Sequence, residues 1–152
     1  MKEFREILVP IDFSEISLGA IDPAYSLAKL IGGKVFLMHV IDLFSTPNPL
    51  YAHYAPRESM LKQDLDKMER EARGKLQSLV PKGKEYAGVE TEILIVSHTT
   101  AYEAIVAEAG RVGADVIVLT HRGWSSLAHI LIGSTAEQVI RHAGCPVMVM
   151  RS

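Results

Sequence analysis

Four short runs of apolar residues, rich in β-branched side chains, constrain the fold of this chain more than any other feature. They span residues 7–11, 34–41, 115–119 and 146–150. Continuous apolar runs of this length are typical of strands buried on both faces of a parallel sheet. A further segment, residues 89–96, alternates apolar and polar residues, which favours an edge strand with one partly wet face.

Helical patterns lie between these runs. Apolar residues recur every three or four positions over 61–79 and again over 102–112. Thr100-x-x-Glu103 predicts a capping box at the start of the second of these helices. Ser134-x-x-Glu137 predicts the start of another helix, which Gly144 would end.

A further helix is predicted from about residue 14 to residue 31, and Pro23 interrupts it. Proline removes one intrahelical hydrogen bond, so the helix is expected to bend or split. Asp22 followed by Pro23 could also be a cap and first helical residue. The alternation of strands and helices predicts a single doubly wound α/β domain over 1–152, with helices on both faces of the sheet.

Composition limits the function classes. The chain has 152 residues, 48% of them hydrophobic, and a net charge of −2, which disfavours a nucleic-acid binder. The single cysteine, Cys145, allows no disulfide within the chain and fits a reducing compartment. No apolar run is long enough to span a membrane, and the first residues have no signal-peptide pattern. A cytoplasmic location is therefore expected.

The segment from Thr120 to Thr135 has the character of a phosphate site. It follows a predicted strand, contains Gly123 and Gly133, and reaches Ser134 at a predicted helix start. A helix N-terminus offers unpaired N–H groups and a partial positive charge, and glycine allows an anion to approach the backbone. Turns and a simple helix cap would need the same residues.

Asp12 follows the first predicted strand. In open α/β sheets, ligands bind beyond the carboxyl ends of strands where the strand order reverses. If the first and fourth strands are neighbours, Asp12 faces the glycine segment across one crevice, where its carboxylate could accept hydrogen bonds from ribose. A cap for the turn at Ser14 is the alternative role for Asp12.

Over nearly its whole length the chain resembles the universal stress protein family. The opening residues 7–12, the closing residues 145–151, and Gly123 followed after nine residues by Gly133-Ser134 carry the resemblance. The resemblance implies an adenine nucleotide alpha hydrolase-like fold with five parallel strands in the order 3-2-1-4-5. It also implies ATP, ADP or AMP as ligand, with Mg²⁺ possible beside ATP. The implied nucleotide-binding residues are Pro10, Ile11, Asp12, Val40, Thr120, Arg122, Gly123, Gly133, Ser134 and Thr135.

The chain departs from the family pattern in two places. Thr120 stands where the family has the first glycine of its signature, and Ser97-His98-Thr99 replaces a G-x-P motif. Thr120 either narrows the site or adds its hydroxyl to it. Arg122 and His121 beside the loop are either anion contacts or solvated charges.

Three hypotheses for function follow. The first is a stress-response protein that holds an adenine nucleotide as a switch or scaffold, with no catalytic residue and at most slow ATP hydrolysis. The second is a nucleotide-free dimeric interaction module of the same fold. The third is a true enzyme such as an adenylyl transferase or an ATP pyrophosphatase, whose HIGH-like and S-G-G-x-D-S-like motifs are absent from this sequence. The sequence also lacks the P-loop lysine, which fits the first hypothesis.

Partners and metals are less constrained. The resemblance implies a homodimer joined through the C-terminal strand, whose edge would offer unpaired backbone groups. An unidentified protein partner is expected to sense the bound state. The six histidines show no compact ligand spacing, so no metal site is predicted. Residues 44–56 form a proline-rich loop whose role the pattern does not assign.

Overall fold

A parallel sheet of five strands forms the centre of the computed structural model, in the order β3-β2-β1-β4-β5. The structure describes residues 2–42, 49–51, 53, 62–122 and 132–151. The strands are β1 (Glu6–Pro10), β2 (Lys34–Asp42), β3 (Glu90–His98), β4 (Val116–Thr120) and β5 (Val147–Met150). This confirms the doubly wound α/β class, the strand order and the edge position of the alternating segment.

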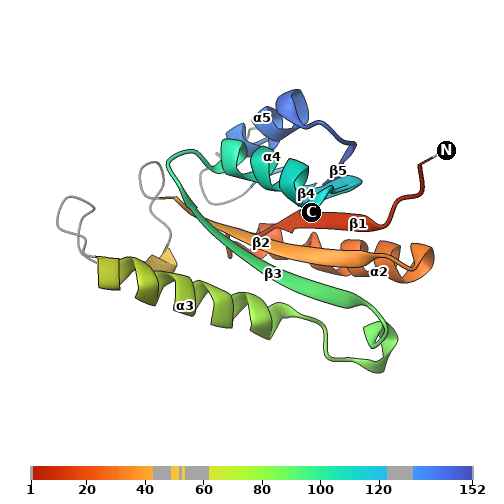
Figure 1. Ribbon diagram of the computed structural model, residues 1–152, viewed down its shortest axis with the longest axis horizontal. Coiled ribbons are helices and arrows are strands. Elements are labelled where there is room, and N and C mark those ends of the chain that lie inside the picture. Colours follow the sequence, from red (N-terminus) through yellow and green to blue (C-terminus); the bar gives the residue numbers. More distant parts are fainter. Residues whose placement is uncertain (1, 43–48, 52, 54–61, 123–131, 152) are drawn as a thin grey trace.

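Helices cover both faces of this sheet (Figure 1). One face carries α4 (Ala101–Val112) and α5 (Ser134–His142). The other carries α1 (Glu15–Leu18), α2 (Ile21–Ile31) and α3 (Lys62–Leu79). Two short 3-10 turns, η1 (Pro49–Tyr51) and η3 (Lys84–Tyr86), complete the described elements. None of the helices in the described part of the chain is long and apolar enough to cross a membrane.

Alternation along the strands divides the core into two layers. Ile7, Val9 and Val118 belong to the cluster beneath α2, whereas Leu8 and Ile117 belong to the cluster beneath α4 and α5. Successive side chains of a strand point to opposite faces, so a continuous apolar run fills both layers. For this reason the continuous apolar runs of the sequence correctly predicted the central strands.

The predicted helix from residue 14 to 31 is split in two. The break lies at Gly19 and Ala20, and Ala20, not Asp22, is the N-cap of α2. Pro23 therefore occupies the first turn of α2, where the first amides of a helix have no intrahelical partner and a missing N–H is tolerated. The split is confirmed, and the cap hypothesis for Asp22 is wrong.

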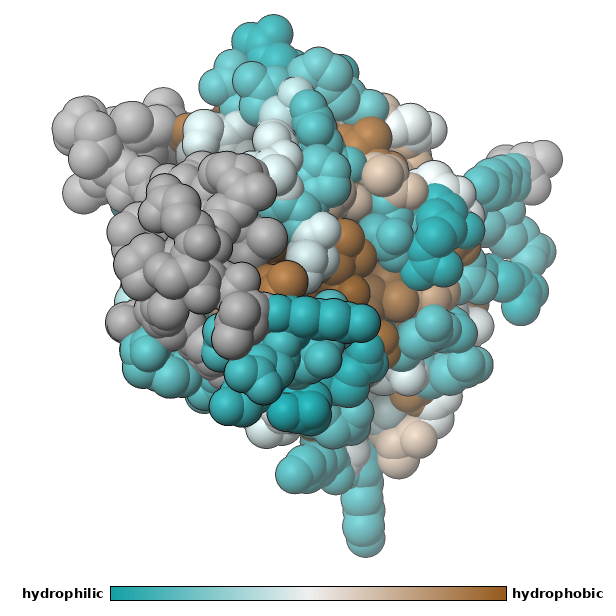
Figure 2. All heavy atoms as spheres, turned by 60° about the vertical axis from the view of Figure 1, so that its left-hand side comes forward, coloured by the Kyte–Doolittle hydropathy of each residue, from teal (hydrophilic) through white to brown (hydrophobic). Residues whose placement is uncertain are grey.

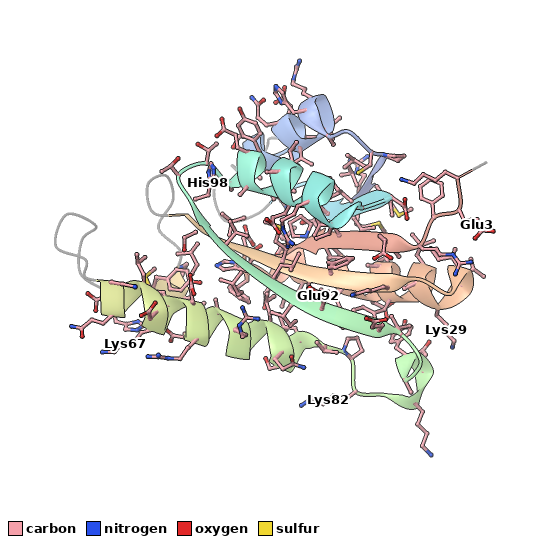
Figure 3. All side chains as sticks on the ribbon, viewed as in Figure 1. Glu3, Lys29, Lys67, Lys82, Glu92 and His98 are labelled. Carbon is pink, nitrogen blue, oxygen red and sulfur yellow. The ribbon has the colours of Figure 1, made fainter. Side chains whose placement is uncertain are left out.

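The predicted capping box at α4 is also wrong. Thr100 is the N-cap, but its side chain makes no capping hydrogen bond. Instead, the Nδ1 atom of His98 accepts the Thr100 amide at 2.9 Å. His98 lies where β3 ends and α4 begins (Figure 3). The start of this helix is thus organised by the residue that ends the preceding strand.

Candidate functional site

The carboxyl ends of β1, β2 and β4 lie side by side at one edge of the sheet. Pro10 pairs with Met38, and Leu8 pairs with Ile117, both in parallel register. Continued to the strand ends, these registers put Asp12 beside Val40 and Ile11 beside Thr120. The reversal of strand order between β1 and β4 occurs here, which is where open α/β sheets bind ligands.

Asp12 organises a tight corner between β1 and α1. Its Oδ1 atom accepts the Ser14 amide at 2.9 Å and the Ser14 hydroxyl at 2.6 Å. The Asp12 amide donates to the Ser17 hydroxyl at 3.3 Å. Phe13, between them, has a φ of 68°. Asp12 therefore does cap the turn at Ser14. These hydrogen bonds also hold its carboxylate at the edge of the sheet.

Helix α5 begins beside the carboxyl end of β4. Gly133 is its N-cap, in an extended conformation and without a capping side chain. Its amide donates to the His121 carbonyl at 2.5 Å, and the His121 amide donates to the Met150 carbonyl at 3.1 Å. These bonds tie the helix start to the ends of β4 and β5. The amides of the first turn can therefore serve as a fixed set of anion donors.

The expected contact residues fall on two faces of the sheet. Pro10 and Val40 share the face covered by α4 and α5, because Pro10 pairs with Met38 and Val40 packs against that cluster. Ile11 lies in the cluster beneath α2. Thr120 follows Val118 by two positions and so shares that second face. The side chains of Ile11 and Thr120 are thus buried in the core, which leaves their backbone atoms for ligand contact.

The remaining expected contacts differ in exposure. Gly133 is buried, Ser134 is exposed, and Thr135 and Arg122 are half-buried. The carbonyl of Arg122 accepts the Thr120 hydroxyl at 2.9 Å. Gly123 and most of the segment 44–56 lie outside the described residues. The expected contact residues that the structure describes therefore form three groups at one edge of the sheet. These are the corner at Asp12, an apolar strip of Pro10 and Val40, and the N-terminus of α5.

A buried histidine beneath this edge was missed by reasoning from sequence. His39, in the middle of β2, is 1% exposed. Its Nδ1 lies 2.7 Å from the Ile11 carbonyl, and its Nε2 lies 2.8 Å from the Tyr51 hydroxyl. Burial lowers its pKa to about 4, against the opposing effects of the Ile11 carbonyl and the Asp12 charge. The available signal was a histidine inside an apolar strand run.

The described surface around the site carries no obvious metal centre. Among the described residues, no group of three His, Cys, Asp or Glu side chains could hold a metal ion. The labelled lysines Lys67 and Lys82 point away from the sheet (Figure 3). In the space-filling view with this side turned forward, hydrophobic residues show near the middle of the described surface, with hydrophilic residues above and below them (Figure 2).

Comparison with known proteins places these features in a family. The profile of the universal stress protein family matches residues 3–151. Universal stress protein MJ0531 of Methanocaldococcus jannaschii is 30% identical over 148 residues, covering 97% of this chain and 82% of that protein. Solved structures extend the likeness to the fold.

The structure of MJ0577, also from Methanocaldococcus jannaschii, superposes with a TM-score of 0.78 at 28% identity, covering 99% of this chain and 98% of that one. A universal stress protein of Archaeoglobus fulgidus, solved in complex with dAMP, gives a TM-score of 0.63 at 21% identity, covering 97% and 98%. The latter likeness shows the common fold alone.

Proposed function

Because the chain belongs to the universal stress protein family, we propose that it binds the AMP moiety of an adenine nucleotide at the carboxyl edge of its sheet. The observation that carries the proposal is that two groups stand at the carboxyl ends of the neighbouring strands β1 and β4. One is the Asp12 carboxylate after β1, and the other is the N-terminus of α5, which is tied to β4 through Gly133 and His121. The carboxylate can accept hydrogen bonds from hydroxyl groups, and the helix N-terminus can donate hydrogen bonds to phosphate.

Each part of the edge has a chemical role in this proposal. The adenine base lies over the apolar strip of Pro10 and Val40, on the face covered by α4 and α5. Asp12 accepts hydrogen bonds from ribose hydroxyls, since its other partners already orient the carboxylate. The first turn of α5, with the Ser134 hydroxyl and backbone amides, binds phosphate. The backbone at Ile11 and Thr120 completes the walls.

Two further groups belong to the phosphate end. Arg122 and Thr135, both half-buried beside the α5 N-terminus, are suited to phosphate oxygens. Gly123 is assigned there by its place in the family signature. Mg²⁺, when the ligand is ATP, would be held chiefly by phosphates and water, as is usual for this ion. The proposed role is therefore binding, with at most slow hydrolysis.

The biological role that we propose is a nucleotide-dependent switch or scaffold acting as a homodimer. β5 is the edge strand beside β4, and apolar side chains are exposed there: Met148 is 40% exposed and Ile140, on α5, is 43% exposed. An edge with unpaired backbone groups and apolar cover suits strand-to-strand pairing with a second copy. Because β5 also contacts the His121 that holds Gly133, dimer and nucleotide site share one strand end.

The alternative function is a nucleotide-free dimeric module, and one experiment separates the two. AMP, ADP, ATP and GMP are titrated separately into nucleotide-stripped protein by calorimetry. The proposal expects saturable binding of adenine nucleotides and weaker binding of GMP, which has a different base edge and the same phosphate. Absence of binding by all four would favour the nucleotide-free module.

A further inference from the structure

His39 uses both of its ring nitrogens in the interior of the protein. Nδ1 lies 2.7 Å from the Ile11 carbonyl, and a carbonyl can only accept, so Nδ1 carries the hydrogen. In a neutral ring Nε2 is then the acceptor, and the Tyr51 hydroxyl donates to it at 2.8 Å. Burial keeps the pKa of this ring at about 4, so one neutral tautomer is present at pH 7.

The residues that His39 contacts flank Asp12. Ile11 precedes Asp12, and its amide also donates to the Met38 carbonyl at 2.7 Å. Phe13 follows Asp12, and its ring centroid lies 4.4 Å from that of His39. Phe13 is also the one non-glycine residue with a positive φ among the described residues. That conformation is unfavourable for a bulky side chain, so packing must help to hold it.

Tyr51 connects this contact to a second segment. It ends the 3-10 turn Pro49–Tyr51, and its ring centroid lies 5.8 Å from that of His39. Two residues later, Nε2 of His53 lies 3.6 Å from a carboxylate oxygen of Glu71 on α3. The turn therefore contacts β2 through Tyr51, and His53, two residues after Tyr51, lies beside α3. His39 is the point at which this turn meets the Asp12 corner.

We propose that His39 is a positioning residue for the nucleotide site. It holds the Ile11 carbonyl and the Phe13 ring, and so sets where the intervening Asp12 presents its carboxylate to ribose. The Tyr51 hydroxyl holds the ring in the tautomer that can donate to Ile11. The ligand part of this inference rests on the proposed function, whereas the effect on the Asp12 corner does not.

The first test deletes one hydroxyl in Tyr51→Phe. The matched control is Tyr86→Phe, which deletes a hydroxyl that donates to Asp22 at 2.6 Å and bonds Ser26 at 2.9 Å, away from the site. AMP affinity and unfolding by urea are measured for both. We expect Tyr51→Phe to weaken AMP binding about three- to tenfold, the usual worth of one hydrogen bond, and Tyr86→Phe to leave it unchanged. Equal affinities in the two variants would overturn the proposal.

Two substitutions of His39 separate its two bonds. His39→Asn retains a donor near the Nδ1 position and so can still reach the Ile11 carbonyl. His39→Gln retains an acceptor near the Nε2 position and so can still receive the Tyr51 hydroxyl. The proposal expects His39→Asn to keep more AMP affinity than His39→Gln, because the Ile11 bond is the one next to Asp12. The reverse order, or equal loss, would overturn it.

A ligand-free measurement keeps the inference separate from the proposed function. Amide nitrogen and proton shifts of Asp12, Phe13 and Ser14 are compared by NMR in wild type, Tyr51→Phe and Tyr86→Phe. Movement of these resonances in Tyr51→Phe alone supports the positioning role. No movement would overturn it. If wild type binds no adenine nucleotide, the proposed function fails, while this comparison still decides the role of His39.

Discussion

The hydroxyl of Thr120 donates a hydrogen bond to the backbone carbonyl of Arg122 at 2.9 Å. The methyl group of the same side chain faces Gly19, where an added Cβ atom would lie 3.8 Å away from it. The side chain is 7% exposed and belongs to the face covered by α1 and α2. Thr120 stands where the family signature has its first glycine. Its side chain lies on the face of the sheet opposite to Pro10 and Val40.

This placement predicts the effect of Thr120→Gly. The variant loses a hydrogen bond and a buried methyl group and gains backbone freedom in a strand, so the free energy of unfolding should fall by about 2 kcal/mol. AMP affinity should not rise, because the threonine does not fill the face over which we place the base. Urea unfolding and calorimetry check both expectations, and Thr120→Ser, which keeps the hydroxyl, should be the milder change. A several-fold gain in AMP affinity for Thr120→Gly would show that threonine obstructs the site.

Asp12→Asn tests the ribose contact. Its remaining side-chain oxygen can still accept from Ser14, so the corner should stay folded, with a small change in unfolding free energy. AMP affinity should fall by about tenfold or more, because one acceptor becomes a donor that faces the ribose hydroxyls.

The matched control for Asp12→Asn is Asp115→Asn, at the opposite end of β4. The Asp115 carboxylate accepts the amides of Arg5 and Glu6 at 2.8 and 2.9 Å. This control should lose stability and keep its AMP affinity. If both variants bind AMP like the wild type, Asp12 is only a turn cap.

The free energy of unfolding should depend on pH because of the lowered pKa of His39. Its pKa is lowered by burial from 6.5 to about 4, so the unfolded chain binds a proton at a higher pH than the folded protein. The free energy of unfolding should therefore fall as the pH drops from 6.5 towards 4, by about 3 kcal/mol for this group.

Urea unfolding of wild type and His39→Gln over this pH range isolates the contribution of His39, because the variant cannot titrate there. The variant should be less stable at neutral pH and should have a shallower slope. Parallel slopes for the two proteins would contradict the assignment.

A substitution on the exposed face of β5 should dissociate the proposed dimer. Met148→Glu puts a charge on the apolar edge, where Met148 is 40% exposed, and burial of an unpaired charge would oppose pairing. Leu30→Glu is the matched control, since Leu30 is 83% exposed on α2. Light scattering at micromolar concentration should give a dimer for the control and a monomer for Met148→Glu. A monomeric wild type would contradict the dimer proposal.

Much of the architecture could be predicted from sequence because the central strands are buried on both faces. Runs such as Ile7–Val9 must be apolar at every position, and this signal is local. The break at Gly19 could not be placed, because its position depends on packing against β4 and not only on the proline at position 23. The placement of Asp12 and Gly133 at one edge of the sheet could be predicted from the expected strand order, in which the first and fourth strands are neighbours.

The contacts that sequence could not supply are those between side chains distant in the chain. Tyr51 and His39 are 12 residues apart and meet only because η1 packs beside β2. The hydrogen bond from the Thr100 amide to His98 depends on a strand end that lies next to a helix start. The positive φ of Phe13 has no local cue such as glycine. These contacts depend on the folded chain, and reasoning from propensity does not reach them.

The most direct test of the central claim is to denature freshly purified protein and identify the small molecule released, by chromatography and mass spectrometry. We expect an adenine nucleotide in near-stoichiometric amount, lost from the Asp12→Asn variant and retained by Asp115→Asn. Release of no nucleotide, together with no uptake of added AMP, ADP or ATP, would contradict it. The edge between Asp12 and Gly133 would then be scaffold, and the function would rest on contacts with other proteins.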